Sequence, residues 1–262
     1  MSLLASLKPL YTLTGFFVGL LVGQTGMGGG SLVTPILVLV FGVTPATAIG
    51  TDLLYASITK AVGTAVHGAH HTVQWPIVGR LAAGSVPATL VTLAAISHFD
   101  LSSRAASGVI TTILGVMLLV TAVALQFRRR LLSLAGDWLE LMPQHRTRTM
   151  TVIIGVVLGV LVTMSSVGAG AIGVTVLLLL YPRLPMARIV GSDIAHAVPL
   201  TLVAGLGHWM LGSVNVPMLV SLLIGSIPGI VLGSLFAVRV PDAVLRPVMA
   251  VTLAVVGGTL VF

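Results

Sequence analysis

The chain is a succession of long apolar segments separated by short polar stretches. Two of these segments are interrupted by glycine-rich stretches. Each uninterrupted segment has about 20 residues, which at a rise of 1.5 Å per residue crosses a hydrocarbon core of ~30 Å. This pattern predicts a bundle of membrane-spanning helices. The segments are 11–41 and 151–180, both interrupted, and 45–66, 76–97, 105–126, 187–210, 217–237 and 244–262.

Composition supports an all-α polytopic membrane protein. The 262 residues are 56% hydrophobic and 7% charged, whereas a soluble domain has roughly 25% charged residues. A membrane β-barrel would alternate polar and apolar positions and would lack such continuous runs. The chain has no cysteine, which excludes disulfides, thiolate metal sites and cysteine nucleophiles. The net charge of +7 is interpreted as a topology signal and not as a nucleic-acid-binding surface.

The first interruption, from Gly23 to Ser31, reads GQTGMGGGS. The apolar runs on either side, about 12 residues or ~18 Å each, are too short to cross a membrane alone. We expect two half-helices that meet within the membrane, an arrangement tolerated only where the break lines a protein-enclosed cavity. The free N–H groups and the dipole of the second half-helix would attract an anion there. A glycine-rich kink without a ligand is the alternative.

The second interruption, from Thr163 to Ala171, reads TMSSVGAGA. Two half-helix N-termini that approach from opposite sides would line one pocket near the bilayer midplane with N–H and hydroxyl donors, which suits an oxyanion that must also leave. Hydroxyls in membrane helices can instead bond back to their own helix. The predicted substrate-binding residues are Gln24, Thr25, Gly26, Gly28, Gly29, Gly30, Ser31, Lys60, Ser165, Ser166, Gly168 and Gly170.

The two halves of the chain repeat each other. The first repeat is 1–126, the second is 150–262, and a basic linker occupies 127–149. Paired glycine-interrupted segments in two halves indicate a transporter binding site. The matching residues lie 140 to 142 positions apart and include Gly15 with Gly155, Gly19 with Gly159, Gly50 with Gly191, Asp52 with Asp193, His67 with His208, Gly84 with Gly225, Ser85 with Ser226, and Gly115 with Gly257.

The basic residues predict the topology. If each broken segment crosses once, the repeats are parallel and, with Lys60 set aside, 7 Lys and Arg lie inside against 5 outside. If each broken segment is a re-entrant hairpin or crosses twice, the repeats are inverted and the counts become 10 and 2. The positive-inside rule favours inverted repeats, with both termini outside and a cytoplasmic linker. The linker itself is either an interfacial helix or a solvated segment.

Asp52 and Asp193 are the only carboxylates within the predicted spans, and Lys60 is the only cation well inside one. Buried ionisable groups in a membrane are costly and therefore suggest a function. For the carboxylates, two roles compete: carrying a coupling proton or sodium ion, and a structural role as acceptors at a broken helix. Lys60 could attract an anion, pair with Asp52, which lies two turns away, or extend to the interface.

The histidines give no firm metal signal. His67, His70 and His71 form a HxxHH cluster, and His208 matches His67 in the second repeat. No carboxylate or thiolate accompanies them at ligand spacing, so no metal or cofactor is predicted. Their roles stay open between interfacial anchors and proton-path residues.

Several motifs together resemble one known family. They are the glycine run from Gly15 to Ser31, the Val43–Asp52 run, the GSVP (84–87) and GSIP (225–228) pair, and the duplication. The chain resembles the sulfite exporter TauE/SafE family, also called TSUP. The resemblance implies a multi-pass permease of the bacterial inner membrane that moves sulfur-containing anions such as sulfite or organosulfonates. Its expected partners are the anion, membrane lipid and a coupling proton or sodium ion; homo-oligomerisation stays open.

Two other transport functions fit the same residues. The same donor-lined pocket would serve an anion channel or a carboxylate permease, because N–H donors read only charge and shape. A membrane enzyme is not expected, since no Ser–His–Asp arrangement occurs at matched depth. The chain has no Walker A loop, so ATP-driven transport is unsupported.

Overall fold

The computed structural model describes residues 9–25, 30–98, 104–128, 130, 143–235 and 242–261. These residues form helices and no strand, which confirms the predicted all-α class. The helices are α1 (Pro9–Thr25), α2 (Gly30–Leu39), α3 (Pro45–Ala69), α4 (Trp75–Ser97), α5 (Arg104–Gln126), α7 (Gln144–Ser165), α8 (Ala171–Leu180), α9 (Met186–Met210), α10 (Val216–Leu235) and α11 (Asp242–Val261).

The helix boundaries follow the apolar segments with one clear difference. The second broken segment begins at Gln144 and not near 151, so α7 takes up the end of the predicted linker. Residues 131–142, where an interfacial helix is predicted, lie outside the described residues. The second half-helix of each broken segment, α2 or α8, has only 10 residues, about 15 Å, and cannot cross a membrane alone.

Within the described ranges, 4 helices are long and apolar enough to cross a membrane. They are Trp75–Ser97, Gly108–Gln126, Gln144–Ser165 and Met186–Met210. α3 and α9 are both 25 residues long and each buries an aspartate, Asp52 or Asp193, but α3 also buries Lys60. It is the helix whose polar side chains the rest of the bundle must enclose.

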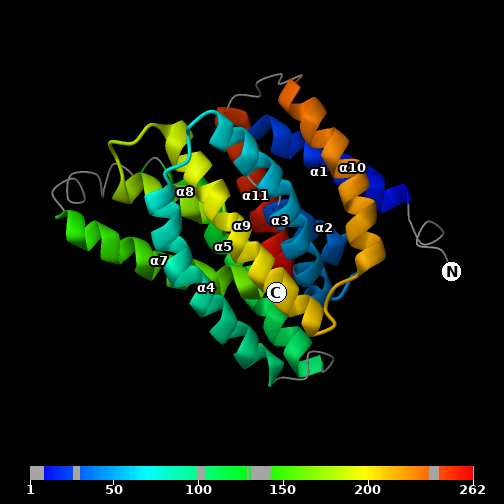
Figure 1. The fold of residues 1–262 in the computed structure, drawn as a ribbon. Coiled ribbons are helices and arrows are strands. Elements are labelled where there is room, and N and C mark those ends of the chain that lie inside the picture. Colours follow the sequence, from blue (N-terminus) through cyan, green and yellow to red (C-terminus); the bar gives the residue numbers. More distant parts are fainter. Residues whose placement is uncertain are drawn as a thin grey trace.

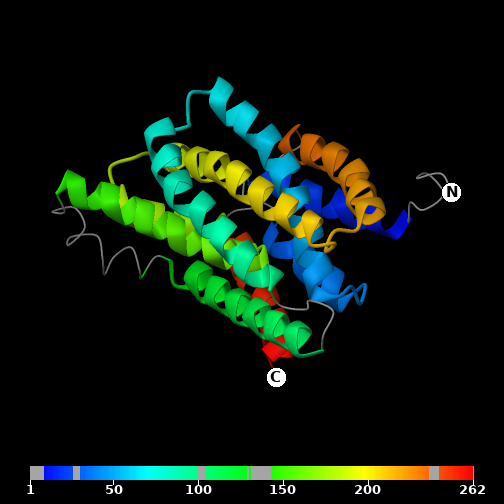
Figure 2. The same cartoon turned by 60° about the horizontal axis from the view of Figure 1, so that its bottom comes forward.

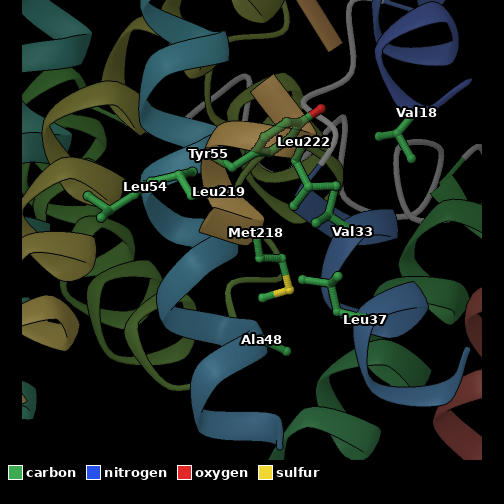
Figure 3. Packing of buried hydrophobic residues seen from close by; sticks show 9 residues of the cluster. All are labelled: Val18, Val33, Leu37, Ala48, Leu54, Tyr55, Met218, Leu219 and Leu222. Atoms are coloured by element: carbon green, nitrogen blue, oxygen red, sulfur yellow. The ribbon is translucent and has the colours of Figure 1, made fainter. Parts of the chain in front are cut away.

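The two repeats are interlocked. α3 and α9 lie side by side in the middle of the bundle, with α1 and α10 paired on one side and α4 and α7 on the other (Figures 1 and 2). α5 packs on α11. Each outer pair therefore takes one helix from each half of the chain. Figure 3 shows one apolar cluster that joins the halves, in which Tyr55 and Leu54 of α3 lie close to Leu219 and Leu222 of α10.

Glycines allow the paired helices to approach backbone to backbone. Gly15 of α1 lies against the Leu222 carbonyl of α10, and its counterpart Gly155 of α7 lies against the Leu81 carbonyl of α4. Leu222 and Leu81 are themselves 141 positions apart. The same contact is thus made twice, once by each copy of the repeat. Matched contacts with a backbone carbonyl are also made by three further pairs of equivalent glycines. The pairs are Gly19 and Gly159, Gly84 and Gly225, and Gly50 and Gly191.

The equivalent helices α3 and α9 run antiparallel. Gly50, near the start of α3, meets the Ser213 carbonyl just after α9, and Gly191, near the start of α9, meets the Thr72 carbonyl just after α3. A two-fold relation between antiparallel helices requires an axis perpendicular to them. This geometry supports the inverted repeat, whose orientation in the membrane stays a prediction.

Candidate functional site

The second helix break is a short irregular turn between α7 and α8. Ser166 has a φ of 57°, Gly168 of 110° and Gly170 of 123°, and the two glycines adopt such angles at little cost because they lack a Cβ atom. The N–H groups of Gly168, Ala169 and Gly170 donate to no acceptor in the described part of the chain. The N-terminus of α8 therefore presents three unused donors.

α3, from the other repeat, holds this break at both ends. The Asp52 carboxylate accepts hydrogen bonds from Ser166 Oγ at 2.9 Å and from Thr34 Oγ1 of α2 at 2.5 Å, both on Oδ2. Two turns further on, Lys60 Nζ donates to the Ala169 carbonyl at 3.2 Å. Asp52 is 0% exposed and Lys60 4% exposed, so Lys60 does not extend to the interface.

Asp193, the counterpart of Asp52, has a different environment. It is 1% exposed, and neither of its carboxylate oxygens has a hydrogen-bond partner among the residues described. The carboxylate lies against Gly173, in the first turn of α8, where a Cβ atom would collide with Oδ1. Lys60 is within coulombic range of both Asp193 and Asp52. The two carboxylates and the ammonium therefore form one buried charged cluster beside the second break.

The residue before each aspartate has a structural role that the sequence did not reveal. Thr51 Oγ1 accepts the Asn215 N–H at 3.1 Å, and Ser192 Oγ accepts the Gln74 N–H at 2.8 Å. In the Gly-Thr-Asp and Gly-Ser-Asp motifs, the glycine and the hydroxyl thus fix the loop that precedes α10 or α4. The aspartate at the third position of each motif belongs to the charged cluster.

A second pair of buried hydrogen bonds was also missed. Tyr55 donates from its hydroxyl to Ser226 Oγ at 2.8 Å, and His196 Nε2 lies 2.9 Å from Ser85 Oγ. Tyr55 matches His196, and Ser85 matches Ser226, at the same offset of 141. The matched serines of the GSVP and GSIP motifs were the available signal, but the sequence did not show which residues they contact.

The histidines of the predicted cluster separate. His67 Nδ1 lies 2.9 Å from Thr72 Oγ1, while His70 and His71 are exposed at the turn after α3. His208 is buried, and its Nε2 lies 3.0 Å from the Thr163 carbonyl at the end of α7. No group of three residues suited to hold a metal ion occurs in the ranges that the structure describes.

The predicted donors fall into four groups. Lys60, Ser166, Gly168 and Gly170 come together at the second break. The Ser165 hydroxyl donates to the Leu161 carbonyl at 2.7 Å, the helical back-bond left open as an alternative. Gly26, Gly28 and Gly29 lie outside the described residues. The structure places the backbone of the remaining four in helices only: Gln24 and Thr25 end α1, and Gly30 and Ser31 begin α2.

Comparison with known proteins agrees with this architecture. A family model described as sulfite exporter TauE/SafE matches residues 11–260. The chain belongs to this family. TauE/SafE proteins are membrane transporters, so the glycine-broken helices lie in a transport protein. No solved structure matches the chain significantly.

Three relatives are aligned over almost their full length. The protein named "Probable membrane transporter protein YjnA" of Bacillus subtilis is 37% identical over 250 residues, 95% of this chain and 98% of the relative. "Probable membrane transporter protein YdhB" of the same organism is 27% identical over 256 residues, 97% and 100% of the two chains. "Probable membrane transporter protein MJ0441" of Methanocaldococcus jannaschii is 24% identical over 268 residues, 96% and 94%.

Proposed function

We propose that the protein is a secondary permease for a small sulfur-containing oxyanion such as sulfite or an organosulfonate, bound at the second helix break. The observation that carries the proposal is the set of unused N–H groups at Gly168, Ala169 and Gly170, next to the Lys60 ammonium. The family match supports transport of this class of anion.

The donors suit an anion in both number and charge. Backbone N–H groups at a helix N-terminus and the positive end of the helix dipole favour an oxyanion. The Lys60 ammonium has three N–H donors, and the Ala169 carbonyl takes one of them. The remaining donors can reach a bound oxyanion while Lys60 supplies charge that the amides lack. Hydrogen bonds to charged groups contribute about 1.5–3 kcal/mol each.

The interlocked repeats support a transport cycle. α3 of the first repeat holds the break of the second repeat through Ser166 and Ala169. A rocking motion of one repeat against the other would therefore act directly on the bound anion, as alternating access requires. The antiparallel course of α3 and α9 supports an inverted arrangement, in which the same site could open to either side.

A ligand-induced thermal shift tests the binding site. Purified protein is heated with sulfite, methanesulfonate, taurine, acetate or chloride, and the apparent melting temperature is recorded. A ligand at a hundred times its Kd stabilises the folded state by about 2.7 kcal/mol. We expect stabilisation by sulfite or a sulfonate but not by chloride. Lys60→Met should abolish the shift.

Thr201 offers a matched control. It occupies the position of Lys60 in the second repeat, and its hydroxyl donates to Ala197 of its own helix at 2.8 Å. Thr201→Val should therefore bind the anion as the wild type does. An equal shift in wild type and Lys60→Met would overturn the proposed site, and stabilisation by acetate alone would indicate a carboxylate permease instead. Flux at channel rates, with no exchange between two labelled anions, would indicate a channel.

A further inference from the structure

The buried charges beside the break do not balance. Asp52 and Asp193 would carry two negative charges against the single positive charge of Lys60, and an anion adds another. Isolated charges in an apolar interior cost several kcal/mol each. Neutralising one carboxyl group removes one of the two excess negative charges that the site would carry with a bound monoanion, and so lowers the cost of binding next to Lys60. The structure distinguishes the two.

Asp52 has hydrogen bonds on one of its two oxygens, while its Oδ1 has no partner among the described residues. Its Oδ2 accepts two hydroxyl hydrogen bonds, from Thr34 and Ser166, and hydrogen bonds to the charged form favour it. Asp193 has no donor on either oxygen in the described chain. A buried carboxylate in that position has no hydrogen bond from the described residues to stabilise its charge. Adding a proton removes the charge.

His196 provides a second acceptor one turn further along α9. It is 1% exposed, its Nε2 contacts Ser85, and its Nδ1 has no partner among the described residues. Residues three apart on a helix lie on the same face. Lys60 acts electrostatically on both His196 and Asp193. The equivalent position on α3 is Tyr55, which also hydrogen-bonds to a serine, but its phenol ring has no nitrogen that could accept a proton.

We propose that Asp193, with His196 Nδ1 as a second acceptor, is the proton-binding site of the transport cycle, and that Asp52 is a structural acceptor at the second break. This inference rests on the proposed anion permease. A proton that forms an O–H bond with Asp193 on one side of the membrane leaves on the other. Carried with a monoanion, it makes the step electrically neutral, so the membrane potential does not oppose entry.

Few other titratable groups face this site. α3 contributes Lys60 and Asp52, and α4 contributes the uncharged Ser85 and carries Arg80 near its start. α9 itself also carries Arg188 in its first turn and the buried His208 near its end. α8 contains no titratable side chain. The titratable residues of α7 are confined to its exposed first turns, at 145–148. A protonation event in the membrane interior can therefore be assigned by substitution at very few positions.

Infrared difference spectroscopy tests the site without any substrate. Purified protein in lipid is cycled between low and high pH, and the carbonyl band of a protonated carboxylic acid is followed. We expect a band that Asp193→Asn removes and Asp52→Asn retains. Persistence of the band in Asp193→Asn, or its loss only in Asp52→Asn, would overturn the assignment. Size-exclusion profiles establish that each variant is folded.

A glycine substitution provides a second test that leaves the carboxyl group in place. A Cβ atom on Gly173 would collide with Asp193 Oδ1, so Gly173→Ala should shift the pH midpoint of the band. Gly63→Ala is the control, because its Cβ would meet only Ile194 Cγ2 at 3.4 Å, an ordinary contact. An unchanged midpoint in Gly173→Ala would contradict the placement of the proton on Asp193.

Transport measurements complete the test. With one proton per monoanion, an inward gradient of one pH unit should sustain about tenfold accumulation, since one unit corresponds to 1.36 kcal/mol. Asp193→Asn should reduce this to no accumulation while preserving exchange of preloaded anion. If no anion is transported but the band belongs to Asp193, the permease proposal fails and the proton site stands. If anion accumulates equally with and without the gradient, the proton site fails and the permease stands.

Discussion

The close approach of α4 to α7 can be tested at one position. A Cβ atom on Gly84 of α4 would overlap the Val152 carbonyl oxygen of α7 and lie 2.8 Å from the Val156 nitrogen. Both are backbone atoms of a helix, so neither can rotate away as a side-chain atom could. Gly84→Ala must therefore push the two helices apart.

The expected loss follows from two opposing terms. Overpacking a well-packed interface costs about 1–3 kcal/mol, and a backbone obstacle places Gly84→Ala near the upper end. The change from glycine to alanine inside a helix itself stabilises the folded state by about 0.5–1 kcal/mol. The net loss is about 2 kcal/mol. For chains of 150–250 residues this lowers the melting temperature by about 4–8 °C.

Gly79, five residues earlier on the same helix, is the control. A Cβ atom there would meet nothing within 4 Å, so Gly79→Ala should leave the melting temperature unchanged or slightly raised. Fluorescence-detected size exclusion after heating compares the two variants with the wild type in detergent. Equal melting temperatures for Gly84→Ala and Gly79→Ala would refute the tight pairing. Gly225→Ala, which meets the Thr12 carbonyl in the equivalent contact, should reproduce the loss.

Three further outcomes are expected. Ser166→Ala removes a hydrogen bond to Asp52 and should lower the free energy of unfolding by about 1.5–3 kcal/mol. Ser166→Gly removes the same hydrogen bond but should recover about 1–2 kcal/mol, because glycine adopts the φ of 57° without strain. Equal losses of stability for the two variants in thermal unfolding would contradict this. Tyr55→Phe and Ser226→Ala should each cost about 1 kcal/mol and combine less than additively in a double-mutant cycle; full additivity would count against the bond. A reporter fused after Phe262 should be active only outside the cytoplasm, and a cytoplasmic signal would restore parallel repeats.

The positions of the helices could be predicted because the membrane imposes a simple rule on the sequence. Backbone groups that face lipid must be bonded within the segment itself, so continuous apolar runs that can form helices mark the spans. The segment predicted at 76–97 is α4, observed at Trp75–Ser97. The start of α7 at Gln144 was missed because its first turns are polar and project beyond the apolar run. Polarity marks the membrane boundary, but a helix can continue past it.

The partners of the buried polar residues could not be predicted. Asp52 is held by Thr34, 18 residues before it, and by Ser166, 114 residues after it. Such contacts depend on how the two halves pack together, and this packing cannot be predicted from the spacing of residues within one helix. The repeat indicated which residues have equivalent places but not that a residue of one half contacts the other half.

The structure explains why some repeated residues match and others differ. A glycine contact between interlocked helices occurs twice, so the same geometric requirement applies in both halves, as with Gly15 and Gly155. The two aspartates of the charged cluster also match, in contrast to Lys60 and two side chains near it, which lie beside the second break and occur once. That is where the halves diverge: Ser166 stands opposite Gly26, Lys60 opposite Thr201, and His196 opposite Tyr55. Introducing Lys at Thr201 should therefore add an uncompensated buried charge and destabilise the protein by several kcal/mol, not create a second anion site. Anion-induced thermal stabilisation of a folded Thr201→Lys, Lys60→Met double variant would show instead that the two breaks are interchangeable.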